Sequence, residues 1–204
     1  MKKLLILLNI LILSACSKVE VSKLSTTDKI VAFGDSLTYG YGASKNSSYP
    51  SKLEQIINIK VVNEGINGNT TEDGLRRVDD LINKHNPQLI LLGLGGNDML
   101  RKIPEQTTVN NLRLLIKKIK EKNIQVILLA TPKPSILGSI GYLKDASFYE
   151  KLAKEENVLL IENIYSDFLS KSEYRSDLIH LNDKGYELVA KEIAKFLEDN
   201  NITN

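Results

Sequence analysis

The sequence predicts an α/β protein, specifically a three-layer α/β/α sandwich with a five-stranded, mainly parallel sheet. Short runs rich in Ile, Leu and Val alternate along the chain with longer amphipathic stretches. Several runs are almost continuously apolar, as expected when helices cover both faces of a parallel sheet. The chain shows no internal repeat and no low-complexity segment, so a single domain accounts for the folded part.

Five strands and five helices are expected in alternation. The strands are expected at residues 29–33, 60–63, 88–94, 125–131 and 158–162. The helices are expected at residues 50–57, 71–85, 108–123, 146–157 and 183–200. Pro50 suits a first helical turn and Asn182 suits a helix N-cap, which supports two of these boundaries.

Residues 1–15 have the pattern of an export signal. Two lysines precede an apolar run, which ends in small residues before Cys16. The run is shorter than the roughly 20 apolar residues of a membrane-spanning helix. The stretch "LSAC" also resembles the lipobox of bacterial lipoproteins, in which the cysteine is lipidated and begins the mature chain. The alternative is a chance cysteine after an ordinary signal peptide.

Three segments are therefore expected: a lipoprotein signal peptide at 1–15, a lipidated Cys16 with a tether at 16–27, and a domain at 28–204. The polar residues 17–27 reach at most about 40 Å when extended. We expect an exported protein, anchored to a membrane and facing the periplasm or the cell exterior. Because Cys16 is the only cysteine, no disulfide forms within one chain.

Charge argues against a nucleic-acid partner. The chain has 27 basic and 25 acidic residues, and two of the basic residues are the signal lysines. The mature chain is therefore close to neutral and lacks the basic surplus of a nucleic-acid-binding domain.

Residues suited to acyl transfer follow the expected strands. Ser36 comes after the first strand, two glycines lie in "NEGINGNT" after the second, and Asn97 follows the third. Asp177 precedes His180 by three residues, a spacing that lets a carboxylate hold an imidazole as a general base. In a parallel sheet these loops gather beyond the carboxyl ends of the strands. Taken singly, each feature is more often an ordinary turn, cap or surface residue.

Histidine and cysteine are too scarce for a typical metal site. The chain has two histidines, and His85 is explained by a favourable position at a helix C-terminus. His180 is then the candidate base. No zinc-type cluster is possible from these residues, although an all-carboxylate site stays open. We expect no metal and no other cofactor.

Four ordered blocks together resemble the GDSL or SGNH hydrolase family, especially its bacterial thioesterase I, lysophospholipase and arylesterase branch. The blocks are "FGDSLTYGYG", "VVNEGINGNTTEDGLRR", "LGLGGNDMLR" and "DLIHLNDKGYELVA". The resemblance implies the flavodoxin-like SGNH fold and a serine esterase. No G-x-S-x-G motif supports the α/β-hydrolase alternative.

The resemblance also implies a role for each site residue. Ser36 would be the nucleophile, His180 the base and Asp177 its partner. The oxyanion hole would consist of the backbone N–H groups of Ser36 and Gly68 and the side chain of Asn97. The family often has glycine after the triad aspartate, whereas this chain has Leu178.

The expected substrates are fatty-acyl or aryl esters, lysophospholipids or acyl thioesters. Residues 99–107 are a candidate lid, and five apolar residues are candidates to line an acyl groove: Ile136, Leu137, Ile140, Tyr142 and Leu143. The alternatives are a carbohydrate O-deacetylase on the same fold, a nucleotide binder using Ser36, Thr38 and Gly40, and a non-catalytic binding lipoprotein.

Overall fold

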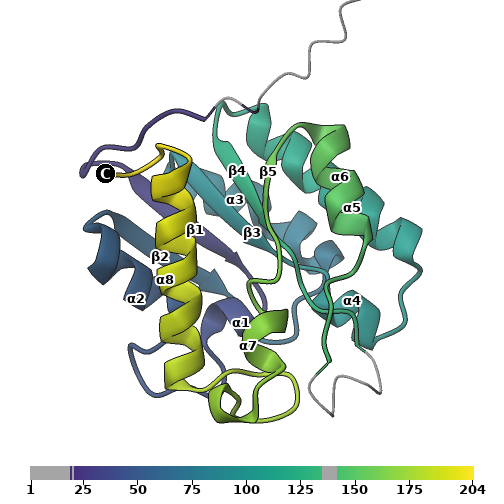
Figure 1. Cartoon of the computed structure of the whole chain (residues 1–204). Coiled ribbons are helices and arrows are strands. Elements are labelled where there is room, and N and C mark those ends of the chain that lie inside the picture. The colour runs from purple at the N-terminus through teal and green to yellow at the C-terminus, as the bar shows by residue number, and fades with distance from the viewer. Residues whose placement is uncertain (1–18, 20, 135–141) are drawn as a thin grey trace, which may run out of the picture.

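The computed structural model describes residues 19, 21–134 and 142–204. Its centre is a sheet of five parallel strands in the order β2-β1-β3-β4-β5, which confirms the predicted fold class (Figure 1). The strands are β1 (Lys29–Gly34), β2 (Lys60–Gly65), β3 (Leu89–Gly93), β4 (Gln125–Leu129) and β5 (Leu159–Ile161). No described helix combines the length and the hydropathy of a membrane span.

Helices cover both faces of the sheet. The longer ones are α2 (Tyr49–Ile57), α3 (Thr71–His85), α5 (Glu105–Lys120), α6 (Phe148–Glu156) and α8 (Asp183–Asp199). Alternate strand residues point to opposite faces, so Ala32 packs in the cluster that holds α2 and α8 side chains. Its neighbour Phe33 packs with side chains from α3, α5 and α6. The near-continuous apolar strands are explained by these two separate cores.

Short helices complete the fold where the sequence predicts only loops. They are α1 (Ser36–Tyr39), α4 (Gly96–Leu100), α7 (Ser166–Leu169) and the 3₁₀ helix η2 (Ser172–Tyr174). Each is too short to show a helical repeat of apolar residues. The predicted helix ends agree better: Pro50 lies in the first turn of α2, and the Asn182 side chain accepts the Gly185 N–H at the start of α8.

Part of the expected tether contacts the domain. Leu24 is buried in the core, and its N–H donates to the carbonyl oxygen of Ile202. The Ser22 N–H donates to Gln125 Oε1, while Gln125 Nε2 donates to the Ser22 carbonyl oxygen. These contacts lie at the amino ends of the strands, far from α1, α4 and α7 (Figure 1).

The order of the strands determines where a site can form. From β1 the chain crosses to β2 on one side and then to β3 on the other, so the topological switch point lies between β1 and β3. Ligands of such sheets bind at the carboxyl ends of the strands beside this point. The segment containing Ser36 leaves β1 here, and the segment containing Asn97 leaves β3.

Close packing at the end of β1 requires a glycine. A Cβ atom at Gly34 would lie 2.1 Å from Thr38 Oγ1 and 2.6 Å from the Gly93 carbonyl oxygen. Gly34 and Gly93 are paired in register, yet the nearest neighbour of a Cβ at Gly93 would be 3.5 Å away, an ordinary contact.

We therefore expect Gly34→Ala to lower the free energy of unfolding by about 1–3 kcal/mol, the usual cost of overpacking. The matched Gly93→Ala variant should change it by less than about 1 kcal/mol, because the methyl group has room. Urea unfolding of both variants measures the difference. Equal destabilisation of the pair would contradict the assignment of the close approach to Gly34.

Candidate active site

A single turn of helix presents Ser36 at the end of β1. Asp35 caps α1, because its Oδ1 accepts the Leu37 N–H at 3.0 Å. Gly40 ends the helix in the left-handed conformation, with φ of 92°. Ser36 is the first residue of α1, and no hydrogen bond within the described part of the chain uses its N–H. This N–H is one of the free donors that every helix start provides.

The structure brings the predicted serine, histidine and aspartate into one hydrogen-bonded row. His180 Nε2 lies 3.0 Å from Ser36 Oγ. On the other side of the ring, His180 Nδ1 lies 2.7 Å from Asp177 Oδ2. The His180 side chain is 12% exposed, whereas that of Asp177 is 45% exposed. The order nucleophile, base, orienting carboxylate is the geometry needed to activate a hydroxyl group.

The Asp-x-x-His turn is held by its own backbone. Asp177 Oδ1 accepts the N–H groups of Ile179 and His180, each at 2.8 Å. Burial alone would raise the pKa of Asp177, but these hydrogen bonds and the His180 ring hold that pKa below its usual range. Leu178 is not among the residues with positive φ, so the position after the aspartate needs no glycine in this chain.

The three predicted oxyanion donors lie around the same cavity as Ser36 Oγ. Gly68 has φ of 77°, a left-handed value that favours glycine, and no hydrogen bond among the described residues uses its N–H. Asn97 Nδ2 donates to the Asn69 carbonyl oxygen at 3.0 Å and lies 3.3 Å from Asp35 Oδ2. The first contact fixes the Asn97 amide. The second is long, so the amide can donate to a better acceptor in its place.

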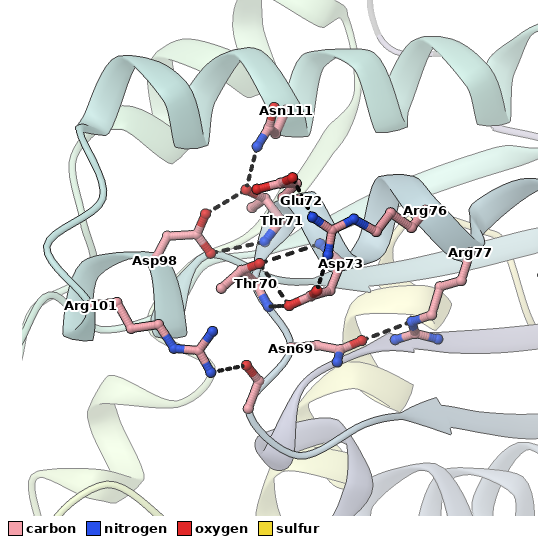
Figure 2. Close-up of polar contacts among 11 residues, drawn as sticks. Asn69, Thr70, Thr71, Glu72, Asp73, Arg76, Arg77, Asp98, Arg101 and Asn111 are labelled. Atoms are coloured by element: carbon pink, nitrogen blue, oxygen red, sulfur yellow. Dashed lines mark hydrogen bonds and ion pairs between the residues drawn. The ribbon is translucent and has the colours of Figure 1, made fainter.

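The loop that carries Gly68, residues 65–70, ends in a well-built helix start (Figure 2). Thr70 and Asp73 form a reciprocal capping box at the start of α3. The buried Asp98 of α4 accepts the Thr71 N–H at 2.9 Å and the Thr71 hydroxyl at 2.5 Å. The segments carrying Gly68 and Asn97 are thus joined to each other through Thr71 and Asp98.

An apolar cavity of about 290 Å³ opens beside Ser36. Its lining is mainly apolar and comes from distant parts of the chain: Leu37, Tyr41, Leu100, Pro132, Pro134, Leu143, Leu169, Leu178 and Ile179. Of the predicted groove residues, Leu143 lines the cavity, Tyr142 is exposed, and Ile136, Leu137 and Ile140 lie outside the described residues. From the candidate lid, Leu100 reaches the cavity.

The nucleotide-binding alternative loses a residue, and His85 has a structural partner outside the site. Thr38 is fully buried against Tyr49 and cannot face a phosphate group, which removes one residue of the nucleotide-binding alternative. His85 pairs with Glu64 at 2.5 Å, a structural contact. In the described ranges, no three His, Cys, Asp or Glu side chains are grouped to hold a metal ion.

Sequence reasoning missed several residues that shape the site. The Tyr41 ring lies against that of His180, with 4.5 Å between their centroids. Arg101 Nη2 donates to the Gly68 carbonyl oxygen at 2.8 Å, and Arg77 Nε donates to Asn69 Oδ1 at 2.9 Å (Figure 2). Both arginines stand inside the recognised blocks, but no local pattern distinguishes them from surface cations.

Comparisons with known proteins give matches over most of the chain. A sequence model described as the GDSL-like Lipase/Acylhydrolase family matches residues 32–188. The chain is 32% identical over 177 residues to thioesterase 1/protease 1/lysophospholipase L1 of Escherichia coli (strain K12), covering 85% of each protein. It is 31% identical over 181 residues to an arylesterase of Vibrio mimicus, covering 84% of this chain and 90% of that protein.

A solved structure is similar to this chain in three dimensions. The chain superposes on the psychrotrophic esterase EstA from Pseudoalteromonas sp. with a TM-score of 0.73 and 25% identity. The superposition covers 84% of this chain and 97% of that one.

Asp35, the residue before Ser36, carries a buried carboxyl group. Burial raises its pKa to about 7, opposed by the Leu37 N–H and reinforced by the charge of Asp98. Its ordinary pKa is 3.8, so between about pH 4 and pH 7 the folded protein keeps a proton that the unfolded chain has released. The contribution of Asp35 to stability therefore falls as pH rises through this window.

Asp35→Asn should remove this dependence while keeping an oxygen for the Leu37 N–H. The variant is expected to gain stability over the wild type as pH rises from about 4 to about 7, by on the order of 4 kcal/mol. Urea unfolding across that range measures the gain. A difference that is constant with pH would contradict the raised pKa of Asp35.

Proposed function

The chain belongs to the GDSL-like lipase/acylhydrolase family and is a GDSL-type esterase, and from this premise we propose that it hydrolyses carboxylic esters and thioesters through Ser36, His180 and Asp177. The observation that carries the proposal is the row of contacts from Ser36 Oγ through the His180 ring to Asp177. The row lies at the wall of an apolar cavity, where a substrate carbonyl has access to Ser36.

The proposed reaction has two steps. His180 Nε2 accepts the proton of Ser36 Oγ as that oxygen bonds to the carbonyl carbon, and Asp177 stabilises the resulting imidazolium. The N–H groups of Ser36, Gly68 and Asn97 donate to the developing oxyanion. His180 then protonates the departing alcohol or thiol. In the second step His180 activates a water molecule, which attacks the acyl group on Ser36 and releases the acid. The same donors stabilise the oxyanion of this step.

The cavity favours fatty-acyl or aryl esters, including lysophospholipids and acyl thioesters. A volume of about 290 Å³ is at the lower end of ligand pockets, and its apolar lining suits an acyl chain or an aromatic ring. Leu178 and Ile179 are 65% and 45% exposed, so the rim is also apolar. The thioesterase and arylesterase relatives support this class of substrate.

Replacing Ser36 by Ala, or His180 by Ala, should abolish hydrolysis of p-nitrophenyl esters, because the nucleophile or its base is lost. Circular dichroism should show an unchanged fold, since neither side chain is part of the core. A fluorophosphonate probe should label the wild type and fail to label Ser36→Ala. Comparable turnover by Ser36→Ala would end the proposal, and an unlabelled, inactive wild type would favour a non-catalytic binding protein.

The same assay separates fatty-acyl esters from the carbohydrate O-deacetylase alternative. With esters of increasing chain length, kcat/KM should rise beyond acetyl because the longer chains fill the apolar cavity. A maximum at acetyl would favour a deacetylase.

We also propose that Cys16 is lipidated after removal of residues 1–15 and anchors the protein to a membrane. Residues 1–18 lie outside the described part of the chain. From Cys16 to the contacts that begin near Ser22, the chain reaches about 20 Å at most. Those contacts lie at the amino ends of the strands, opposite the site (Figure 1). An anchor there would direct the cavity away from its own bilayer.

Cys16→Ser should move the protein from the membrane fraction to the soluble fraction and prevent labelling with radioactive palmitate. The wild type on membranes should hydrolyse a soluble p-nitrophenyl ester with the same kcat as the released variant, because the cavity stays accessible. Palmitate-free wild type would contradict the anchor. A membrane-bound wild type that regains activity only on release would contradict the orientation.

A further inference from the structure

Arg77 makes an unusual set of contacts for a helix residue next to an active site. From α3, its Nε donates to Asn69 Oδ1 at 2.9 Å (Figure 2). Its Nη2 donates to the carbonyl oxygens of Gly34 and Glu64, each at 3.0 Å. The guanidinium lies 4.3 Å from the centroid of the Phe33 ring, and the side chain is only 19% exposed. One side chain thus joins the ends of β1 and β2 to the loop at residues 65–70.

Two of the three proposed oxyanion donors lie beside these contacts in the sequence. Gly34 precedes Ser36 by two residues, and Asn69 directly follows Gly68. The third donor is reached through the backbone, because the Asn69 carbonyl oxygen accepts Asn97 Nδ2 at 3.0 Å. A shift of Asn69 would therefore displace both the Gly68 N–H and the Asn97 amide.

We propose that Arg77 is a positioning residue that holds the Gly68 and Asn97 donors in register with Ser36, an inference that rests on the proposed function. It touches neither the substrate nor the reacting atoms. Its effect passes through Asn69 on the loop side and through Gly34 on the strand side. Donor placement matters because these groups act on charge that appears only in the transition state, where a displacement of about 1 Å can cost roughly 100-fold in rate.

The shape of the guanidinium is essential to this role. Its planar fork reaches acceptors on three segments at once, whereas a lysine ammonium is a single point on a flexible stem. Its charge is balanced nearby, since Glu64 Oε2 lies 3.7 Å from Arg77 Nη1. Arg77→Lys therefore keeps the partly buried charge pair and removes the fork.

Arg76 is a matched control on the same helix. It is the neighbouring arginine, its side chain is 65% exposed, and its ion pairs are with Glu72 and Asp73 at the surface of α3. It makes no contact with Asn69 or the strand ends among the hydrogen bonds of the described residues. Arg76→Lys tests the same substitution at a side chain that is linked to the loop only indirectly, through Asp73 of the capping box.

The experiment measures kcat, KM and thermal unfolding for the wild type, Arg77→Lys and Arg76→Lys with a p-nitrophenyl ester. Arg77→Lys should lower kcat by about 10- to 100-fold with little change in KM, because the donors bind the transition state more than the ester. Its affinity for an alkyl trifluoromethyl ketone, which forms an anionic adduct on a reactive serine, should fall by the same factor as kcat/KM. Arg76→Lys should match the wild type in all of these values.

Asn69→Ala provides a second, independent variant in case Arg77→Lys unfolds. It removes the acceptor on the loop and leaves the partly buried charges of Arg77 and Glu64 in place. It should show the same loss of kcat and of ketone affinity, and the double variant should lose less than the product of the two effects.

Normal kcat and ketone affinity in either folded variant would overturn the inference, as would a raised KM at unchanged kcat. If fluorophosphonate labels the wild type but Arg77→Lys keeps full activity, the inference fails and the proposed function stands. A wild type that neither labels nor hydrolyses esters would remove the proposed function, and the inference with it.

Discussion

The close approach of β1 and β3 at their carboxyl ends is the constraint on which the site depends. Gly34 faces Gly93 in register, and Thr38 folds back over Gly34 into the space that a side chain would fill. This packing turns the chain sharply into α1 and leaves Ser36 at the helix start with a free N–H. Because Asn97 follows β3, the same strand pair brings it to the cavity beside Ser36.

Short-range hydrogen bonds shape the turns that carry the other site residues. The Asp177 carboxylate accepts two N–H groups of its own turn, so local hydrogen bonds fix the segment from 177 to 180. The capping box of α3 fixes the end of the loop at residues 65–70 locally, and the contact between Thr71 and Asp98 joins that loop to the segment carrying Asn97. Local motifs therefore shape the turns around the site, and contacts between distant segments hold these turns together at the end of the sheet.

Much of this arrangement was predictable because periodicity and motif order are local properties of the sequence. Periodicity predicts the five strands and the long helices, and the family resemblance implies the site residues Ser36, Gly68, Asn97, Asp177 and His180. Four of these five line one cavity, and Asp177 contacts the His180 ring. The short helices α1 and α4 were not predicted, since four or five residues show no helical repeat. The buried packing of Leu24 was also missed, because "SKVEVSKLSTT" has no pattern of its own.

Arg76 and Arg77 show where sequence reasoning ends. They are identical neighbours on an amphipathic helix, and both read as solvated cations. In the structure one lies at the surface beside Glu72, whereas the other lies over Phe33 and reaches Gly34 and Asn69. The difference arises from a rotation of about 100° per residue around α3, which turns Arg77 toward the strand ends. Whether a cation at such a position supports catalysis is decided by what the rest of the fold places within its reach.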